Sequence, residues 1–304
     1  SRRRHTSSST SRGLGDVYKR QVDMFFMGNG LAINDPNSGY DETGFSAVEN
    51  HCYDPDYKDK KTDQNISNMY ANREPRFYAS VVYQGRSWFK KWMNGNPNYI
   101  VDFSAGGGND LSNGDNVKTG YMLGKFKNRT VNHASGDTQS WKRVSIIYRL
   151  AEFYLFYAEA LNETDPSNPD IIKYIDMVRE RAGIPGYQTM NDNGIKTGII
   201  GNYDKQFDAI QHERYVELYC EGQRYFDIRR WMICGDKDRI GCDQTRFYGM
   251  NMKGSKDKTP GEPTSYYTRT KVENRQWTDK LYLYPIHQNV IELANGRIPQ
   301  NYGW

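Results

Sequence analysis

Residues 149–163 read RLAEFYLFYAEALNE, and this stretch decides the fold. Its apolar residues recur at spacings of three and four, which predicts an α-helix with one apolar face. That face is expected to consist of Leu150, Phe153, Tyr154, Tyr157 and Leu161. Three alanines in the same stretch would allow a second helix to approach closely.

The second predicted helix lies in residues 165–186, which read DPSNPDIIKYIDMVRERAGIPG. Capping residues and Pro169 open it, and Gly183 followed by Pro185 closes it. The apolar pattern repeats at Ile171, Ile172, Ile175 and Val178. Because about half a dozen residues join the two helices, we expect an antiparallel hairpin, the unit from which helical solenoids are built.

A single helical hairpin cannot cover its own apolar surface, so the sequence predicts further helices, some of them upstream. A third long helix is predicted from about Lys205 to Glu221. Its candidate core positions are Phe207, Ile210, Leu218 and Tyr219.

The part of the chain before residue 141 is dominated by Gly, Asn, Asp and Tyr, as in SAGGGNDLSNGDN (104–116). Such clusters are typical of turns and loops. Residues 77–84, FYASVVYQ, nearly alternate in the way that predicts a short strand. We therefore expect one intertwined domain with three regions: loop-rich residues 22–140, helical residues 141–232, and a loop and closing segment over residues 233–304.

Aromatic residues make up 14% of the chain, and 24 of them are tyrosines. Together with a mean hydropathy of −0.90, this predicts polar loops around an aromatic-rich core. The formal charge of +4 comes from residues 1–21, which carry +5, so residues 22–304 carry −1. That balance gives no support to binding of nucleic acid or anionic lipid.

Residues 1–21 are rich in Arg and Ser, unlike the rest of the chain. We interpret the string GLGDVYKRQ (13–21) as translated sequencing adapter, which makes residues 1–21 a non-native leader. A transit peptide and a basic arm are the alternatives. The native protein is then expected to continue upstream of Val22, so the missing export signal says little about localisation.

Several sequence blocks together resemble the SusD/RagB family of outer-membrane nutrient-binding lipoproteins. The C-terminal blocks are RLAEFYLFYAEALNE, VRERAGIP, HERYVELYCEGQRYFDIRRW (212–231) and YLYPIHQNVIELANGRIPQNYGW (282–304). The middle blocks are VDMFFMGNG (22–30), NREPRFYASVVYQGRSW (72–88) and GYMLGKFKN (120–128). Their order and spacing make the resemblance specific, and it spans residues 22–304.

The resemblance implies a mainly α fold of tetratricopeptide-like helical hairpins, with a loop-rich ligand-facing region that contains short strands. It also implies a lipid anchor on the extracellular face of a Gram-negative outer membrane. The implied partners are an oligosaccharide (a peptide in some branches) and a SusC-type TonB-dependent transporter that receives it. The family's lipobox cysteine and first helix pairs have no counterpart here, so part of its ligand site is expected upstream.

The segment 212–231 holds the densest group of charges. Glu213, Glu217 and Glu221 are four residues apart and are expected on one helix face. A catalytic interpretation would make two of them a glycosidase acid/base pair, but adjacent carboxylates on one helix are poorly placed to straddle a glycosidic bond. We favour a structural ion-pair lock, in which the further members are Arg214, Arg224, Asp227, Arg229 and Arg230.

Metal and cofactor signals are weak in this sequence. His212-Glu213 begins like a zinc-protease motif, but Val216 stands where the second histidine is needed. Gly106, Gly107 and Gly108 are interpreted as turn glycines. Oxygen ligands for calcium are offered by Asp35, Asn37, Asp41 and Glu42, although a cluster of Asx turns is the favoured interpretation. We predict no cofactor and no metal.

Four cysteines lack the CxxC spacing of a zinc site and do not form a disulfide framework at this length. They are Cys52, Cys220, Cys234 and Cys242. A local Cys234–Cys242 bridge and free thiols both stay open.

Aromatic residues in polar loops are the candidate ligand contacts, because sugar rings pack their C–H faces on aromatic planes while amides and carboxylates bond the hydroxyls. The candidates are Tyr40, Tyr53, Tyr57, Trp88, Trp92, Tyr99, Tyr266, Tyr267 and Trp277. The alternative for each is that it pins a loop to the core. Trp88 and Trp92 are the strongest, since RSWFKKWMNGNPNY (86–99) places them among several amides. They could also share a helix face and belong to the core.

Four functions are compatible with these patterns. Capture of glycan at the cell surface for nutrient uptake, without catalysis, agrees with the block order and the aromatic loops. A peptide-binding member of the family and a tetratricopeptide-type protein scaffold are the alternatives. A glycan-cleaving enzyme would need two carboxylates that face each other across a cleft.

Overall fold

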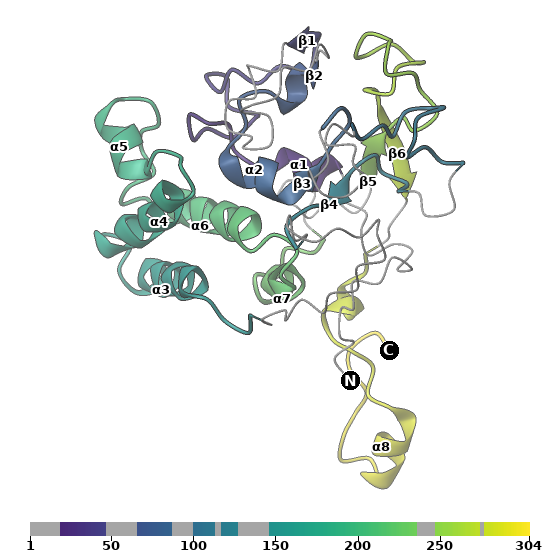
Figure 1. Cartoon of the computed structure of the whole chain (residues 1–304). Coiled ribbons are helices and arrows are strands. Elements are labelled where there is room, and N and C mark those ends of the chain that lie inside the picture. The colour runs from purple at the N-terminus through teal and green to yellow at the C-terminus, as the bar shows by residue number, and fades with distance from the viewer. Residues whose placement is uncertain are drawn as a thin grey trace, which may run out of the picture.

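The protein is seen in a computed structural model that describes residues 19–46, 66–86, 100–112, 117–126, 146–235, 247–273 and 277–304. A layer of helices lies beside a loop-rich body that holds short two-stranded sheets (Figure 1). The mainly helical class with short strands is the one that the sequence predicts, and it is confirmed.

The helical layer is built from consecutive helices in one part of the chain. They are α3 (Leu150–Thr164), α4 (Asp170–Arg181), α5 (Tyr187–Asp192), α6 (Tyr203–Glu217) and α7 (Gln223–Arg230). Helices α3 and α4 form the predicted hairpin, and α6 packs against both. Helix α4 ends at Arg181, just before the predicted stop at Gly183, which adopts φ +83°, a left-handed conformation that glycine tolerates. Leu155, Ile175 and Ile210 are fully buried between these helices.

The apolar face predicted for α3 is wrong for its outer residues. Leu150 is 62% exposed, Phe153 55% and Tyr157 47%, whereas Tyr154 and Leu161 are partly buried. The buried side consists of Ala151, Glu152, Leu155, Ala158, Glu159 and Asn162. This side carries two alanines together with three polar residues, and it packs on α4 and α6 because its small residues permit the closer approach.

The third predicted helix is confirmed with shifted bounds, because α6 begins at Tyr203 rather than Lys205 and ends at Glu217 rather than Glu221. Beyond it, Cys220 and Gly222 adopt positive φ angles of 58° and 88°, which reverse the chain before α7. Of its predicted core residues, Ile210, Leu218 and Tyr219 are buried and Phe207 is half-buried.

The strand predicted over residues 77–84 is wrong for its first half, which is helical. Helix α2 (Pro75–Ser80) begins at Pro75, whose fixed φ suits the first helical turn. Strand β3 (Val81–Val82) follows and pairs antiparallel with β4 (Met122–Leu123). The remaining elements of the body are α1 (Lys19–Asp23), β1 (Phe45–Ser46) paired with β2 (Ile66–Ser67), the 3-10 helix η2 (Asn68–Tyr70), and β5 (Phe247–Met250) paired with β6 (Arg269–Glu273).

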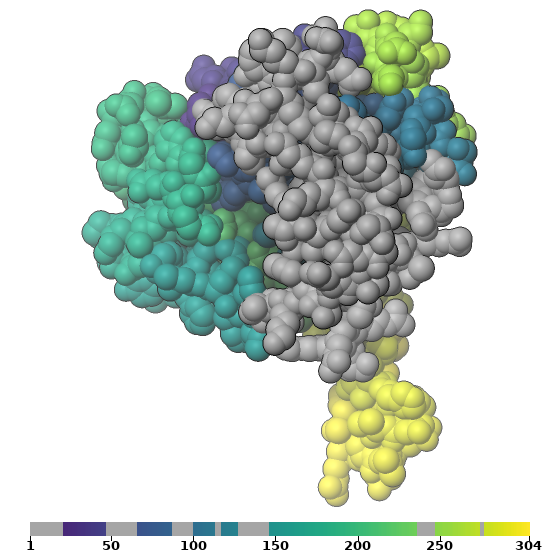
Figure 2. Space-filling model, viewed as in Figure 1, coloured from purple at the N-terminus to yellow at the C-terminus, as the bar shows by residue number. Residues whose placement is uncertain are grey.

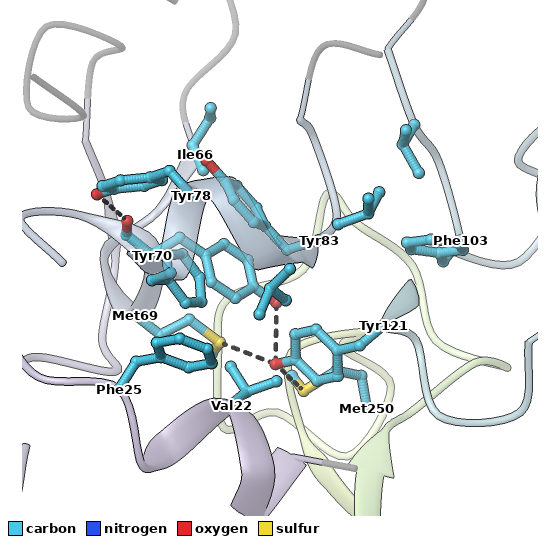
Figure 3. Packing of buried hydrophobic residues seen from close by; sticks show 14 of the residues in the cluster. Val22, Phe25, Ile66, Met69, Tyr70, Tyr78, Tyr83, Phe103, Tyr121 and Met250 are labelled. Carbon is cyan, nitrogen blue, oxygen red and sulfur yellow. Dashed lines mark hydrogen bonds between the residues drawn. The ribbon is translucent and has the colours of Figure 1, made fainter. Parts of the chain in front are cut away.

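The core of the body is rich in tyrosine, as Figure 3 shows. Tyr70 and Tyr121 are fully buried, and their hydroxyls are 3.2 Å apart in a hydrogen bond. The Tyr78 hydroxyl donates to the Tyr70 carbonyl at 2.7 Å. Buried tyrosines combine a large apolar ring with a polar tip that needs a partner, and these tips find one. Much of the unusual aromatic content therefore serves packing.

The C-terminal residues form an arm that projects from the body, as Figures 1 and 2 show. It contains the 3-10 helix η4 (Asp279–Tyr282) and α8 (Gln288–Leu293). The Gln300 side chain accepts a hydrogen bond from the Ile286 amide at 2.7 Å and donates one to the Ile286 carbonyl at 2.9 Å. Among the described residues, no helix combines the length and the apolar content needed to cross a membrane.

Candidate functional site

The glutamates of the charged segment are bonded to basic residues from other elements. The Glu213 carboxylate contacts Arg76 at 2.5 Å and Arg179 at 3.4 Å. The Glu213 and Arg179 side chains are both fully buried. Because α2 supplies Arg76 and α4 supplies Arg179, Glu213 joins the body to the helical layer.

Glu217 and Glu221 extend the same cluster toward the start of α3. Glu217 contacts Arg76 at 2.9 Å and also pairs with Arg149 and Arg181. Glu221 contacts Lys125 at 2.6 Å and Arg149 at 2.8 Å. All three glutamates therefore neutralise basic groups.

The basic residues predicted as lock members behave in two ways. Arg214 contacts Asp227 at 3.0 Å, and Arg230 contacts it at 2.9 Å. Arg224 and Arg229 instead lie over aromatic rings, with guanidinium carbons 4.3 Å and 3.6 Å from the ring centres of Tyr215 and Tyr225.

Sequence spacing missed Arg76, Arg149, Arg179, Arg181 and Lys125, the main partners of the glutamates. They lie up to 141 positions away in the sequence, so local patterns carry no sign of the pairing.

The basic residues around Glu217 keep its carboxylate charged near neutral pH. Burial would raise its pKa, but Arg76 and Arg149 outweigh burial and hold the pKa at about 2. A carboxyl group this acidic is a poor proton donor near neutral pH. Glu74, which pairs with Arg76 at 2.6 Å, has a raised pKa because it is fully buried.

Five of the nine candidate aromatic residues lie outside the described residues: Tyr53, Tyr57, Trp88, Trp92 and Tyr99. Tyr40 is partly buried and donates a hydrogen bond from its hydroxyl to Glu42 at 2.7 Å. Trp277 is partly buried and packs edge-on against Tyr282, with ring centres 4.8 Å apart.

Tyr266 and Tyr267 are core residues, which corrects the expectation that they offer exposed platforms. They are 0% and 6% exposed, and the Tyr266 hydroxyl donates to the Gly120 carbonyl at 2.9 Å. Gly120 makes room for the Tyr266 side chain, since a Cβ there would lie 2.4 Å from its hydroxyl oxygen.

The loop that carries Asp35 and Asp41, the candidate calcium ligands, is closed by its own hydrogen bonds. Asp35 accepts from the Asn37 amide at 3.1 Å, and Asp41 accepts from the Thr43 amide at 2.7 Å, which are the favoured Asx turns. Asp35 also contacts Lys196 at 2.6 Å. Within the described ranges, no group of three His, Cys, Asp or Glu residues is arranged to hold a metal ion. Cys220 carries a free thiol and Cys234 is buried, whereas Cys52 and Cys242 lie outside the described residues, so the Cys234–Cys242 bridge stays a prediction.

A pocket of about 310 Å³ lies where three loops of the body meet. It is lined by Gln84 and Gly85 after β3, by Ile100, Val101, Asp102 and Gly108, and by Lys256. The loops are tied together by the Ala105 amide, which donates to the Gly254 carbonyl at 3.0 Å. At the upper right of Figure 2, the blue surface of residues 100–112 adjoins the yellow-green surface of residues 247–273. No pocket residue was among the sequence candidates, because Asp102 and Lys256 are 154 positions apart.

The comparison with known families decides the identity of the fold. The model of the SusD family matches residues 4–304. The chain belongs to the SusD family. The resemblance seen in the signature blocks is thereby confirmed. The match begins inside residues 1–21, so their interpretation as a non-native leader stays a prediction.

Individual relatives of this SusD family chain agree with the assignment. SusD-like protein P2 of Formosa agariphila is 37% identical over 82 residues, which are 27% of this chain and 16% of the relative. A solved SusD-like protein from Bacteroides fragilis has a TM-score of 0.64 and 25% identity, covering 95% of this chain and 47% of its own. The solved protein BT4246 has a TM-score of 0.70 and 27% identity, covering 95% and 44%. The chain thus spans less than half the length of these solved relatives.

Proposed function

We propose that this SusD family protein binds glycan at the cell surface and delivers it to a SusC-type TonB-dependent transporter for nutrient uptake. The observation that carries the proposal is the family match over residues 4–304. We further propose that the whole protein is lipid-anchored on the extracellular face of the outer membrane, as the family resemblance implies.

The arrangement of charges supports binding rather than catalysis. Glu213, Glu217 and Glu221 are each paired with Arg or Lys groups that join separate elements. Glycoside hydrolysis needs one protonated and one free carboxyl group across a cleft. Carboxylates neutralised by arginine do not meet that requirement.

The loops of the body are the part of the chain that we assign to the ligand. The Val101 amide donates to the Arg86 carbonyl at 2.8 Å, and the Gly85 amide donates to the Val101 carbonyl at 2.9 Å. Arg86 and Ile100, which flank the segment outside the described residues, are therefore held close together beside the pocket. Trp88, Trp92 and Tyr99 belong to this intervening stretch. We propose that they provide stacking surfaces for sugar rings.

Two other functions differ from glycan binding in the ligand and in the surface that would bind it. A peptide-binding family member would use the same loops but recognise backbone amides. A protein scaffold would use the helical layer, where Phe153 and Tyr157 are exposed on α3. The scaffold assigns no role to the loops around the pocket, whereas glycan binding does.

Electrophoresis of the chain through gels that contain single polysaccharides tests the proposal. We expect at least one polysaccharide to retard the wild type, and Trp88→Ala and Trp92→Ala to weaken the retardation. Trp304→Ala is the matched control, because Trp304 lies on the C-terminal arm and is 43% exposed. If no polysaccharide retards the wild type while oligopeptides bind to it, the glycan assignment is wrong.

A further inference from the structure

Hydrogen bonds hold the residues of the pocket between Gln84, Asp102 and Lys256 in place, although the pocket lies among loops. Asp102 Oδ1 accepts hydrogen bonds from Gln84 Nε2 at 2.8 Å, from Ser104 Oγ at 2.6 Å and from the Ser104 amide at 3.1 Å. Gln84 is only 2% exposed, and its other amide atom accepts from the Phe103 amide at 2.6 Å. These bonds fix the Asp102 carboxylate before any ligand arrives.

Lys256 approaches the other oxygen of Asp102 from a separate loop. Its ammonium lies 2.7 Å from Asp102 Oδ2, and its side chain is 47% exposed. The loop is held by the Ser255 amide, which donates to the Thr264 carbonyl at 2.9 Å. Gly254 lets the strands of this loop approach, since a Cβ there would lie 2.4 Å from the Ser265 carbonyl carbon. A ligand would therefore find both charged groups in place, at little ordering cost.

We propose that this pocket is a subsite for one uncharged sugar ring, bound through two neighbouring hydroxyls to the Asp102–Lys256 pair. The inference rests on the proposed glycan-binding function and adds a position and a ligand class to it. One hydroxyl would donate to Asp102 Oδ2 while its neighbour accepts from the Lys256 ammonium.

The hydrogen-bonding capacity of the pair fits this role. A carboxylate oxygen has two acceptor positions and an ammonium has three donors, and the contact between Asp102 and Lys256 uses one of each. Hydroxyls both donate and accept, so a pair of adjacent hydroxyls can bond to both groups at once. The pocket volume of about 310 Å³ lies at the lower end of ligand pockets, which suits one ring rather than several.

The charge of the pocket decides between neutral and anionic sugars. Burial would raise the pKa of Asp102, but the bonds from Lys256, Ser104 and Gln84 lower it below its ordinary value. The bond to Asp102 raises the pKa of Lys256. Both groups are therefore ionised near neutral pH, and their charges cancel. A uronic acid or a sulfated sugar would bring an anion beside the Asp102 carboxylate and compete with it for Lys256. Binding of either anionic sugar is therefore disfavoured.

Ligand-detected NMR titrations of the chain test the subsite. They measure the affinities of the methyl glycosides of glucose, galactose and mannose and compare them with the affinity of glucuronate. At least one neutral glycoside is expected to bind the wild type more tightly than glucuronate does. Lys256→Met keeps the aliphatic stem and removes the ammonium, and it should weaken binding by about tenfold or more. Lys253→Met is the matched control, since Lys253 is an exposed lysine on the same loop, and it should bind as the wild type does.

Three results would overturn the subsite: equal binding by Lys256→Met and the wild type, tighter binding of glucuronate than of every neutral glycoside, or binding of none of the neutral glycosides. Polysaccharide gels run in parallel separate this failure from failure of the proposed function. If a polysaccharide retards the wild type and Lys256→Met equally, glycan binding stands and the subsite is wrong. If no polysaccharide retards the wild type, glycan binding itself is wrong.

Discussion

Arg76 and Glu213 lie 137 positions apart in the sequence and meet in a buried ion pair, with Nη1 and Oε1 2.5 Å apart. Arg76 belongs to α2 in the loop-rich body, and Glu213 belongs to α6 in the helical layer. The residues that make the family signature recognisable are therefore a joint between the two parts of the fold. We propose that ligand recognition belongs instead to the loops of the body.

Removing the Glu213 carboxylate should destabilise the protein strongly. Glu213→Ala leaves Arg76 and Arg179 with less negative charge in a buried site, and we expect a loss of about 3–5 kcal/mol in the free energy of unfolding. Urea denaturation followed by circular dichroism measures it. Asp170→Ala is the control, because the Asp170–Lys173 pair is exposed and its loss should change stability by less than about 0.5 kcal/mol. Equal losses in the two variants would show that the buried ion pairs of Glu213 contribute no more to stability than an exposed pair does.

Stability should fall in acid because of Glu217. Its pKa in the folded protein, about 2, is below the ordinary value of 4.5, so its contribution is complete above pH 4.5 and is lost as the pH falls toward 2. The loss is on the order of 3 kcal/mol. Urea denaturation from pH 7 to pH 2.5 should therefore show a smaller acid-dependent loss for Glu217→Gln than for the wild type. Comparing the two proteins removes the contributions of other groups, such as Glu74. Parallel pH profiles would show that the Arg76 and Arg149 contacts do not hold the Glu217 charge.

Gly120→Ala should be more harmful than Gly106→Ala, although both glycines have positive φ angles of 77° and 79°. Both substitutions strain the backbone by about 1–2 kcal/mol. At Gly120 the new Cβ also meets the Tyr266 hydroxyl at 2.4 Å, whereas at Gly106 nothing lies within 4 Å. We expect an additional loss of about 1–3 kcal/mol at Gly120. Combining Gly120→Ala with Tyr266→Phe should recover part of this loss, and strictly additive losses in thermal unfolding would contradict the packing.

The two sides of α3 should respond differently to truncation. Leu155 is fully buried, so Leu155→Ala is expected to cost about 2–5 kcal/mol in the free energy of unfolding. Phe153 is 55% exposed, and Phe153→Ala should stay within about 0.5 kcal/mol of the wild type. Urea denaturation measures both losses. A larger loss of stability at Phe153 than at Leu155 would show that the face predicted from spacing alone is the buried one.

Local sequence signals predicted the parts of the fold that local physics determines. The three-and-four spacing and the glycine at 183 located the α3–α4 hairpin, because helix periodicity and left-handed termini are properties of neighbouring residues. The same spacing did not show which side of α3 is buried, since that depends on the shapes of α4 and α6.

The candidate site depended on contacts between distant residues, and sequence spacing could not supply them. In the sequence, Tyr266 resembles an exposed aromatic residue of a loop. In the structure it is buried, and its hydroxyl donates a hydrogen bond to the carbonyl of Gly120, which lies 146 positions earlier. Asp102 and Lys256 form a pocket only after two loops meet. Trp88 and Trp92 were proposed from the composition of their segment, and their role stays a prediction.

The separation of structural joint from ligand face is tested most directly by gel retardation of Glu217→Gln on a polysaccharide that retards the wild type. Circular dichroism should first show that the variant is folded at neutral pH. We expect the folded variant to be retarded as strongly as the wild type while its urea midpoint falls. Loss of retardation in a folded Glu217→Gln protein would place the charged cluster in the ligand site and contradict its assignment as a joint.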